Sequence, residues 1–307
     1  MKTLIISHDD CLLHDPGFKI AESPARVKAV LAAVSDLRGT EHLPAPLATP
    51  EQILRVHTAE YWDGLVENEP QEGLVELDWD TFMSKGSIDA TLRGSGAACF
   101  AVDQIMAGKA RNAFCAVRPP GHHSYDRVAM GFCLSNHVAI AARHAQQVHG
   151  LERIAVLDFD VHHGNGTQEV FEDSPEVLFV SSHQFPLYPG TGTVEETGAG
   201  NIVNIPLPPG TDGTGFRKAW SERGFSRLFS FDPEMILISA GFDAHQRDPL
   251  GQLLLEEDDY AWFTREVRAF ADECCDGRLV SVLEGGYDLE GLAASARAHV
   301  EAMSQGN

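Results

Sequence analysis

Basic residues are scarce in this sequence. It has 23 Lys and Arg against 45 Asp and Glu, which gives a formal net charge of −22. A field of this sign repels nucleic acids and anionic membrane surfaces, and it attracts cationic ligands. We therefore expect no nucleic-acid partner and no membrane partner, although plain solubility explains the charge at least as well.

Long apolar runs and cysteine pairs are missing as well. No window is apolar enough to span a membrane, and the apolar start of the chain is too short for a signal peptide. The six cysteines form no C-x-x-C pair and mostly lie in apolar segments, as reduced core thiols do. This usage predicts a reducing, cytoplasmic compartment. No repeat or linker divides the chain, so we expect a single domain over residues 1–307.

Short apolar runs alternate with helical patterns along the chain. Strands are expected at about 4–7, 114–117, 154–157, 177–182, 202–205, 235–239 and 279–283. Helices are expected at about 23–37, 51–66, 84–108, 136–148, 213–229, 258–274 and 289–304, with loops at 44–50 and 67–80. This alternation favours a three-layer α/β fold, in which helices cover both faces of a single parallel sheet.

The stretch 154–167 concentrates polar chemistry. Its first four residues indicate a buried strand, and Asp158, Asp160 and His162 follow that strand directly. In an extended chain, alternate side chains point to one side, so these three groups should converge. Without a cation, carboxylates that close would force one of them to bind a proton. The pattern therefore predicts a metal site, and a solvated polar loop is the alternative.

Polar residues also end other expected strands, namely His122 and His123, Asp243, and Tyr287. The carboxyl ends of parallel strands lie on the same side of a sheet, so distant residues can share one pocket there. Three residues offer oxygen and nitrogen ligands suited to a catalytic zinc ion with an open position: Asp160, His162 and Asp243.

The paired histidines would carry out proton transfer near neutral pH. Asp158 and Asn165 are the nearest candidate partners for the second nitrogen of His122 or His123. Tyr287, on a Gly-Gly turn, can donate a hydrogen bond to an oxyanion. Together with a metal ion, this set is suited to hydrolysing an amide.

Six segments carry a family resemblance. They are Arg118-Pro-Pro-Gly-His-His, Gly131-Phe-Cys, Leu157-Asp-Phe-Asp-Val-His-His-Gly-Asn-Gly-Thr, Tyr188-Pro-Gly-Thr-Gly, Ala240-Gly-Phe-Asp-Ala-His-Gln-Arg-Asp-Pro-Leu-Gly and Glu284-Gly-Gly-Tyr. In this order they resemble the zinc-dependent histone deacetylase family. The nearest branch is the class II-like bacterial amidohydrolases, which include acetylpolyamine deacetylases. The likeness runs from about residue 4 to residue 292.

The resemblance implies an arginase/deacetylase α/β fold and one catalytic Zn²⁺ on Asp160, His162 and Asp243. It implies that His123 is the general base and acid and that His122 is its electrostatic partner. Asp158 would then orient His122, Asn165 would orient His123, and Tyr287 would polarise the acyl carbonyl. A structural K⁺ is implied beside the zinc, on groups matching Asp158, Asp160, His162, Ser181 and Ser182.

The resemblance also implies a narrow substrate channel. Its residues would be Gly131, Phe132, Tyr188, Leu250 and, at the rim, Asp80. From composition alone, the two aromatic residues could equally be core residues, and Asp80 could equally be a solvated loop acid.

Other residues of the same types favour structural roles. His163 should turn away if His162 points inward. His8, His14 and His183 could line the pocket rim or be satisfied loop residues, and the loop role is favoured. Cys133 is expected as a core thiol.

Two departures from the family pattern bear on the substrate. Ile20-Ala-Glu-Ser-Pro24 stands where many relatives have His-Pro-Glu-Ser-Pro, so the size of the pocket rim is open. Leu250 stands where polyamine-specialised relatives can have Glu. The expected substrates are therefore acetyl-lysine side chains, acetylated polyamines or another small N-acyl amine, as free molecules or in peptides. The oligomeric state stays open, and a homo-oligomer is among the options.

Two other functions compete with the deacetylase hypothesis. A binuclear Mn²⁺ ureohydrolase on the same fold would need further Asp or His ligands at the strand ends. A non-catalytic module that binds acyl amines would be expected to lack Tyr287, His123 or a metal ligand.

Overall fold

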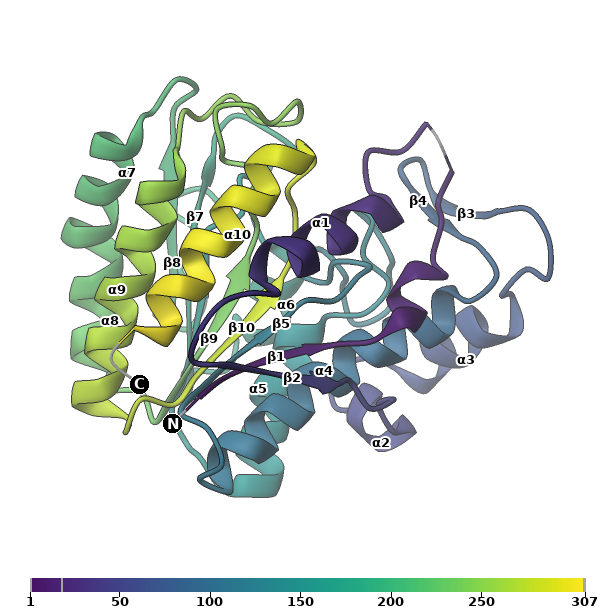
Figure 1. The fold of residues 1–307 in the computed structure, drawn as a ribbon, viewed down its shortest axis with the longest axis horizontal. Coiled ribbons are helices and arrows are strands. Elements are labelled where there is room, and N and C mark those ends of the chain that lie inside the picture. Colours follow the sequence, from purple (N-terminus) through teal and green to yellow (C-terminus); the bar gives the residue numbers. More distant parts are fainter. Residues whose placement is uncertain (1, 18, 306–307) are drawn as a thin grey trace.

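The computed structural model describes residues 2–17 and 19–305 (Figure 1). Its centre is an eight-stranded sheet with the order β2-β1-β5-β10-β9-β6-β7-β8, and every neighbouring pair is parallel. The strands are β1 (Thr3–Ser7), β2 (Thr40–Pro44), β5 (Asn112–Cys115), β6 (Ile154–Asp158), β7 (Val177–Gln184), β8 (Ile202–Leu207), β9 (Met235–Ala240) and β10 (Leu279–Leu283). The predicted α/β fold with one large parallel sheet is confirmed.

Helices cover both faces of this sheet (Figure 1). They are α1 (Pro24–Val34), α2 (Pro50–Ile53), α3 (Ala59–Glu67), α4 (Ser87–Met106), α5 (His137–His149), α6 (Asn165–Phe171), α7 (Gly213–Ala219), α8 (Phe225–Phe231), α9 (Glu257–Cys274) and α10 (Leu289–Ser304). Alternate strand residues serve the two faces, as the pleat requires. Ile5 and Leu157 pack in the core with α1, α9 and α10, whereas Ile6 and Val156 pack in the core with α4 and α5.

The functional strand ends predicted from the sequence are brought together by the strand order. β5, β10, β9 and β6 are consecutive neighbours in the sheet. Because all four are parallel, the segments that follow them leave the sheet at the same edge. Residues 118–123, 159–163, 241–243 and 284–287 therefore meet there.

Several predicted elements were wrong. The helix expected at 51–66 is two helices, because Thr49 caps α2 and Thr58 starts α3 by accepting a hydrogen bond from the Tyr61 N–H. The stretch expected as a loop at 67–80 contains β3 (Val75–Asp78), which pairs with β4 (Thr81–Met83) in an antiparallel hairpin. The helix expected at 213–229 is interrupted by one π turn at Trp220–Gly224. The edge strand β2 and helix α6 were not expected.

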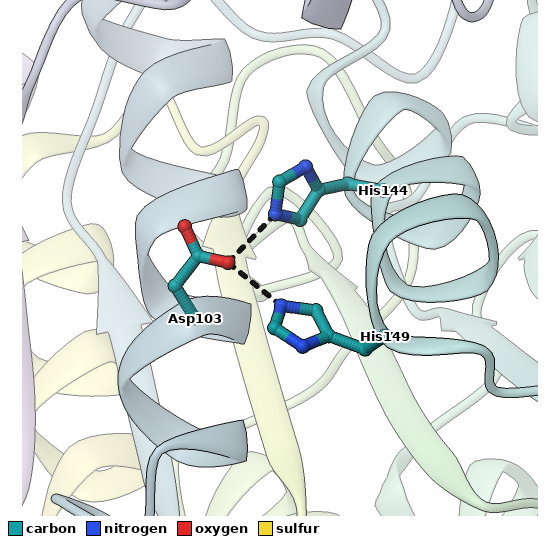
Figure 2. Close-up of side chains that lie close together, drawn as sticks. All are labelled: Asp103, His144 and His149. Atoms are coloured by element: carbon teal, nitrogen blue, oxygen red, sulfur yellow. Dashed lines mark hydrogen bonds and ion pairs between the residues drawn. The ribbon is translucent and has the colours of Figure 1, made fainter.

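Helices α4 and α5 are joined by a carboxylate that two histidines share (Figure 2). Nε2 of His144 and Nε2 of His149 lie 2.8 and 2.7 Å from Oδ1 of Asp103. Arg55 donates to Nδ1 of His144 at 2.9 Å, so Nε2 of that ring carries the proton that Asp103 accepts. These hydrogen bonds are complete without an ion. We therefore interpret the cluster as a link between the two helices.

None of the helices in the described part of the chain is long and apolar enough to cross a membrane.

Candidate active site

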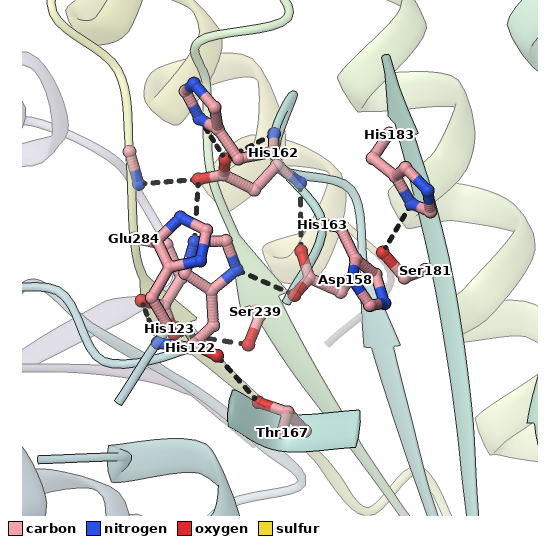
Figure 3. Close-up of polar contacts among 12 residues, drawn as sticks. His122, His123, Asp158, His162, His163, Thr167, Ser181, His183, Ser239 and Glu284 are labelled. Atoms are coloured by element: carbon pink, nitrogen blue, oxygen red, sulfur yellow. Dashed lines mark hydrogen bonds and ion pairs between the residues drawn. The ribbon is translucent and has the colours of Figure 1, made fainter. Parts of the chain in front are cut away.

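In the segment after β6, aspartate side chains accept hydrogen bonds from backbone N–H groups two residues further along. Oδ1 of Asp158 accepts the Asp160 N–H at 3.0 Å, and Oδ1 of Asp160 accepts the His162 N–H at 2.9 Å (Figure 3). The alternation seen in the sequence therefore does place these side chains together. They are arranged by two successive Asx-type turns beyond the end of the strand, and not by an extended strand.

Three buried residues form the candidate metal centre. The ligand atoms of Asp160, His162 and Asp243 all lie within 4.8 Å of one another. Nδ1 of His162 is 3.1 Å from Oδ1 of Asp160 and 3.2 Å from Oδ2 of Asp243. One imidazole and two carboxylates around a common point match the ligand types and number of a three-ligand zinc site.

The electrostatics of this group call for a cation. Burial and the neighbouring Asp160 raise the pKa of Asp243 to about 7. Burial alone would lower the pKa of His162, but its hydrogen bonds to the two carboxylates raise it to about 10. In the absence of a metal, a proton on His162 therefore balances the buried carboxylates. A divalent ion would take over that role, so the residues fit a bound metal.

Two glycines let the backbone approach the carboxylates. A Cβ at Gly241 would lie 2.0 Å from Oδ2 of Asp160, and one at Gly285 would lie 2.1 Å from Oδ2 of Asp243. The Gly285 N–H instead donates to Oδ2 of Asp160 at 2.9 Å. Close packing of these glycines thus holds the ligand carboxylates in place.

The paired histidines lie beside the metal centre, with ring centroids 4.0 Å apart. Nδ1 of His122 is 2.9 Å from Oδ2 of Asp158, and Nδ1 of His123 is 2.6 Å from Oδ1 of Asn165. The amide oxygen can only accept, so Nδ1 of His123 carries a proton and its Nε2 is free to accept one. Each histidine therefore has the orienting partner that the family resemblance implied.

The two histidines differ in charge because their surroundings differ. Burial lowers the pKa of His122, but Asp158 and Asp160 outweigh it, and the pKa lies well above the ordinary value. Burial and the positive charges of His122 and His162 hold the pKa of His123 well below the ordinary value. At neutral pH one ring is thus charged, and the other is a neutral base.

A cavity of about 350 Å³ opens onto these groups, and His123, His162 and Tyr287 are among its lining residues. The Phe132 ring is 5.7 Å from the Tyr287 ring, and the Tyr188 ring is 5.3 Å from the His123 ring, both edge-on. The structure therefore places both predicted aromatic residues in the cavity wall.

The other expected channel residues, Asp80, Gly131 and Leu250, also line the cavity. Asp80, however, is buried, and its Oδ1 accepts hydrogen bonds from the Thr81 hydroxyl at 2.7 Å and the Gly131 N–H at 3.1 Å. Gly131 and Phe132 both have positive φ. The contacts observed for Asp80 thus hold the turn that presents the Phe132 ring.

The serines expected at a potassium site lie on β7 next to the end of β6. Ser181 is the strand partner of Asp158, and its hydroxyl is 3.0 Å from Nδ1 of His183. The hydroxyl of Ser182 accepts a hydrogen bond from the Trp220 indole at 2.9 Å. Both serines are buried behind the metal centre and do not belong to the cavity lining.

His163 and Cys133 lie near the site but have structural surroundings. His163 contacts Thr191 at 2.8 Å and Gln168 at 2.9 Å, so it points away from the metal centre. Burial raises the pKa of the Cys133 thiol well above its ordinary value, which disfavours a nucleophilic role.

Three buried charged residues near the site were not identified from the sequence: Arg26, Asp248 and Glu284. Oε2 of Glu284 accepts the N–H groups of Gly121 and His122, at 2.6 and 3.1 Å, and so fixes the loop that carries the histidines. Figure 3 shows Glu284 beside His122. Arg26 donates to the Gly286 carbonyl at 2.6 Å, and its guanidinium lies 4.8 Å from the Tyr287 ring centroid. Glu284 and Asp248 lie within two of the family motifs, but nothing in the sequence indicated their roles, and no motif contains Arg26.

Comparison with known proteins agrees with this geometry. The histone deacetylase domain matches residues 20–303. The chain belongs to the histone deacetylase family. It is 41% identical over 300 residues to a probable deacetylase of Archaeoglobus fulgidus, covering 95% of this chain and 83% of the relative. It is 38% identical over 293 residues to a histone deacetylase-like amidohydrolase of Pseudomonas aeruginosa, covering 92% and 77% of the two chains.

A solved structure of this family gives the same result. The crystal structure of the HDA15 HD domain superimposes with a TM-score of 0.90 at 33% identity, covering 98% of this chain and 90% of that domain. The family resemblance inferred from the six motifs is therefore confirmed, and membership in the histone deacetylase family supports a hydrolase that acts on amides.

Proposed function

We propose that this protein is a zinc-dependent deacetylase that hydrolyses N-acetylated amines to acetate and free amine. One observation carries the proposal. The buried Asp160, His162 and Asp243 group, the neutral base His123 and the Tyr287 phenol all meet at one cavity. A metal site, a proton acceptor and an oxyanion donor together are what amide hydrolysis requires.

The metal centre would hold one Zn²⁺ on Asp160, His162 and Asp243. When bound, zinc would supply Lewis acidity to the attacking water and to the acyl carbonyl. We also propose a structural K⁺ near Asp158, Asp160, His162, Ser181 and Ser182. The pairing of Asp158 with Ser181 across β6 and β7 supports this grouping.

The chain's own residues would move the protons. Nε2 of His123 accepts a proton from the attacking water and later gives it to the leaving amine nitrogen, because its Nδ1 is held by Asn165. Asp158 keeps the charged His122 ring in place beside it. The Tyr287 hydroxyl, whose pKa burial raises well above its ordinary value, stays protonated and donates to the carbonyl oxygen.

The cavity wall would select an extended acyl-amine chain. Phe132 and Tyr188 would flank the methylene groups, as aromatic walls flank apolar chains elsewhere. Leu250 and the exposed Trp79 lie among the outer lining residues. This wall accommodates acetyl-lysine and acetylated polyamines alike, so both belong in the proposed substrate class. All six cysteines are free thiols, which supports a cytoplasmic location.

Turnover of an acetyl-lysine reporter tests the proposal. We expect activity that chelation abolishes, that Zn²⁺ restores, and that His123→Ala lowers by about a thousandfold. Acetylated polyamines, acetyl-lysine peptides and other small N-acyl amines assayed side by side would rank the substrates. An inactive protein that still binds acyl amines would support a binding module, and two manganese ions per chain would support a ureohydrolase.

A further inference from the structure

Asp248 directs its carboxylate at the backbone of two loops around the cavity. Oδ2 accepts the N–H of Tyr287 at 2.6 Å and the N–H of Asp288 at 3.2 Å. Oδ1 accepts the N–H of Leu250 at 3.0 Å. The side chain is buried, at 7% exposure, so these bonds are shielded from water. Hydrogen bonds to a buried carboxylate are among the stronger ones in proteins.

The backbone just before Tyr287 is conformationally free. Gly285 and Gly286 precede it, and Gly286 has φ +119°, a conformation that side chains disfavour. Asp288 follows it directly and caps α10. The Asp248 carboxylate bonds to the backbone between the two glycines and α10, at Tyr287 and Asp288. These bonds set the backbone direction of Tyr287.

The other contacts of Tyr287 act on its ring. The Arg26 guanidinium lies over one face, at 4.8 Å from the centroid, and the Phe132 ring meets it edge-on. The bond from Asp248 to the Tyr287 N–H fixes the backbone from which that ring extends. Leu250 also lines the cavity, and its N–H donates to the same carboxylate. Asp248 therefore holds part of the cavity wall as well as Tyr287.

We propose that Asp248 is a positioning residue, which sets the Tyr287 phenol at the distance needed to donate to the acyl oxygen. This role rests on the proposed deacetylase function. A displacement of about 1 Å in a catalytic donor can cost about a hundredfold in rate. Asp248 would therefore act on kcat through Tyr287 and would not touch the substrate.

The experiment compares Asp248→Asn and Asp248→Ala with wild type, using acetyl-lysine and trifluoroacetyl-lysine reporters. We expect kcat on the acetyl reporter to fall about tenfold for the Asn variant, which keeps one acceptor oxygen, and more for the Ala variant. KM should stay within about threefold. The loss should be smaller on the trifluoroacetyl reporter, because its electron-poor carbonyl needs less help from a hydrogen-bond donor.

A double-mutant cycle with Tyr287→Phe tests whether the effect passes through the phenol. In the Tyr287→Phe background, Asp248→Asn should lower kcat by less than about twofold. The matched control is Asp259→Asn. Asp259 is also a buried carboxylate that accepts a backbone N–H, from Glu256 at 3.0 Å, but it lies on α9 outside the cavity lining. This control should lower the melting temperature and leave kcat near wild type.

The outcomes separate this inference from the proposed function. A zinc-loaded wild type without turnover on either reporter would defeat the deacetylase proposal itself. An active wild type in which the Asp248 and Tyr287 effects multiply would overturn the positioning role alone. The positioning role would also be overturned if the Asp248 variants lost zinc in parallel with their loss of kcat. If Asp248→Ala does not fold, Asp248→Asn, which keeps the size of the side chain, decides the question.

Discussion

Two adjacent histidines in this protein have opposite protonation states, and their orienting partners differ in charge. His122 faces the carboxylate of Asp158, whereas His123 faces the amide oxygen of Asn165 at 2.6 Å. The amide orients the ring as well as a carboxylate would but adds no negative charge. Burial and the positive charges of His122 and His162 therefore hold the pKa of His123 low, and the ring remains a base at neutral pH.

Asn165→Asp should move the acid limb of the pH profile. A carboxylate at this place would raise the pKa of His123, so the neutral form needed for catalysis would be lost at a higher pH as the pH falls. We expect the acid limb of kcat/KM to shift upward by about one pH unit or more, measured between about pH 4 and 9.

Asn165→Ala separates the effect of the added charge from the loss of the hydrogen bond to His123. It removes the hydrogen bond without adding a charge, so activity should fall while the acid limb does not move upward. An unchanged limb in Asn165→Asp would show that His123 is not the titrating base.

Candidate metal ligands and proton-transfer residues could be identified from the sequence, whereas the supporting roles of Asp248 and Glu284, which lie in the same family motifs, could not. Polar groups at strand ends stand out because they interrupt apolar runs, as Asp158 and Asp243 do. Asp248 and Glu284 bond to backbone groups that lie 39 and 162 residues away in the chain. A bond to the backbone leaves no partner side chain in the sequence, so only the fold reveals it.

At the scale of elements, local patterns failed for an edge strand and a hairpin that have few buried side chains. β2 is an edge strand that pairs with β1 alone, and its burial pattern shows no buried residue. The hairpin β3–β4 is likewise short and only partly buried. Strands in the middle of the sheet are buried throughout, and their apolar runs predicted them correctly.

A glycine in α4 shows how closely the elements pack. A Cβ at Gly96 would lie 2.1 Å from the Pro46 carbonyl oxygen and 2.7 Å from the Ala48 nitrogen. Gly96→Ala should therefore destabilise the protein by about 2 kcal/mol, in spite of the better helix propensity of alanine. Urea unfolding would measure the change.

Gly64 in α3 is the matched control, because a Cβ there would meet no atom within 4 Å. Gly64→Ala should stabilise the protein by about 0.5–1 kcal/mol. If Gly96→Ala is neutral or stabilising, α4 does not pack against the 46–48 segment as described.

The link between α4 and α5 should contribute modestly to stability. Asp103 is 41% exposed, so its two hydrogen bonds are partly screened. Asp103→Asn should cost about 1 kcal/mol at pH 7, whereas Asp63→Asn, at an exposed position of α3, should be near neutral. Burial raises the pKa of Asp103, but the two histidines outweigh it and lower the pKa.

The pH dependence of this difference follows from the direction of that shift. A carboxyl with a lowered folded-state pKa contributes its stability above the unfolded pKa and loses it as the pH falls through the folded pKa. The stability difference between wild type and Asp103→Asn should thus be present above the ordinary carboxyl pKa and disappear as the pH falls through the lowered folded-state pKa of Asp103. Melting temperatures measured across the pH range would check it, and a difference that persists below the carboxyl range would contradict it.

At the scale of the whole molecule, topology explains why a site spread over 165 residues of sequence could be predicted at all. The strand order could not be predicted from the sequence, because pairing between distant strands leaves no local pattern. Parallel strands present their carboxyl ends at one edge in any order, which predicts the side of the sheet but not that these ends lie close together. The order observed goes further and makes β5, β10, β9 and β6 direct neighbours.

The net charge of −22 should favour cationic substrates at the encounter step. We expect kcat/KM for an acetylated polyamine, which keeps positive charges, to fall several-fold as salt rises from about 0.05 to about 0.5 M. A neutral acetyl-lysine reporter is the internal control and should change by less than about twofold over the same range. Steady-state kinetics at several salt concentrations, on one enzyme preparation, make the comparison. An equal decline for both substrates would assign the effect to the enzyme's stability or metal binding, and the acidic surface would then serve solubility alone.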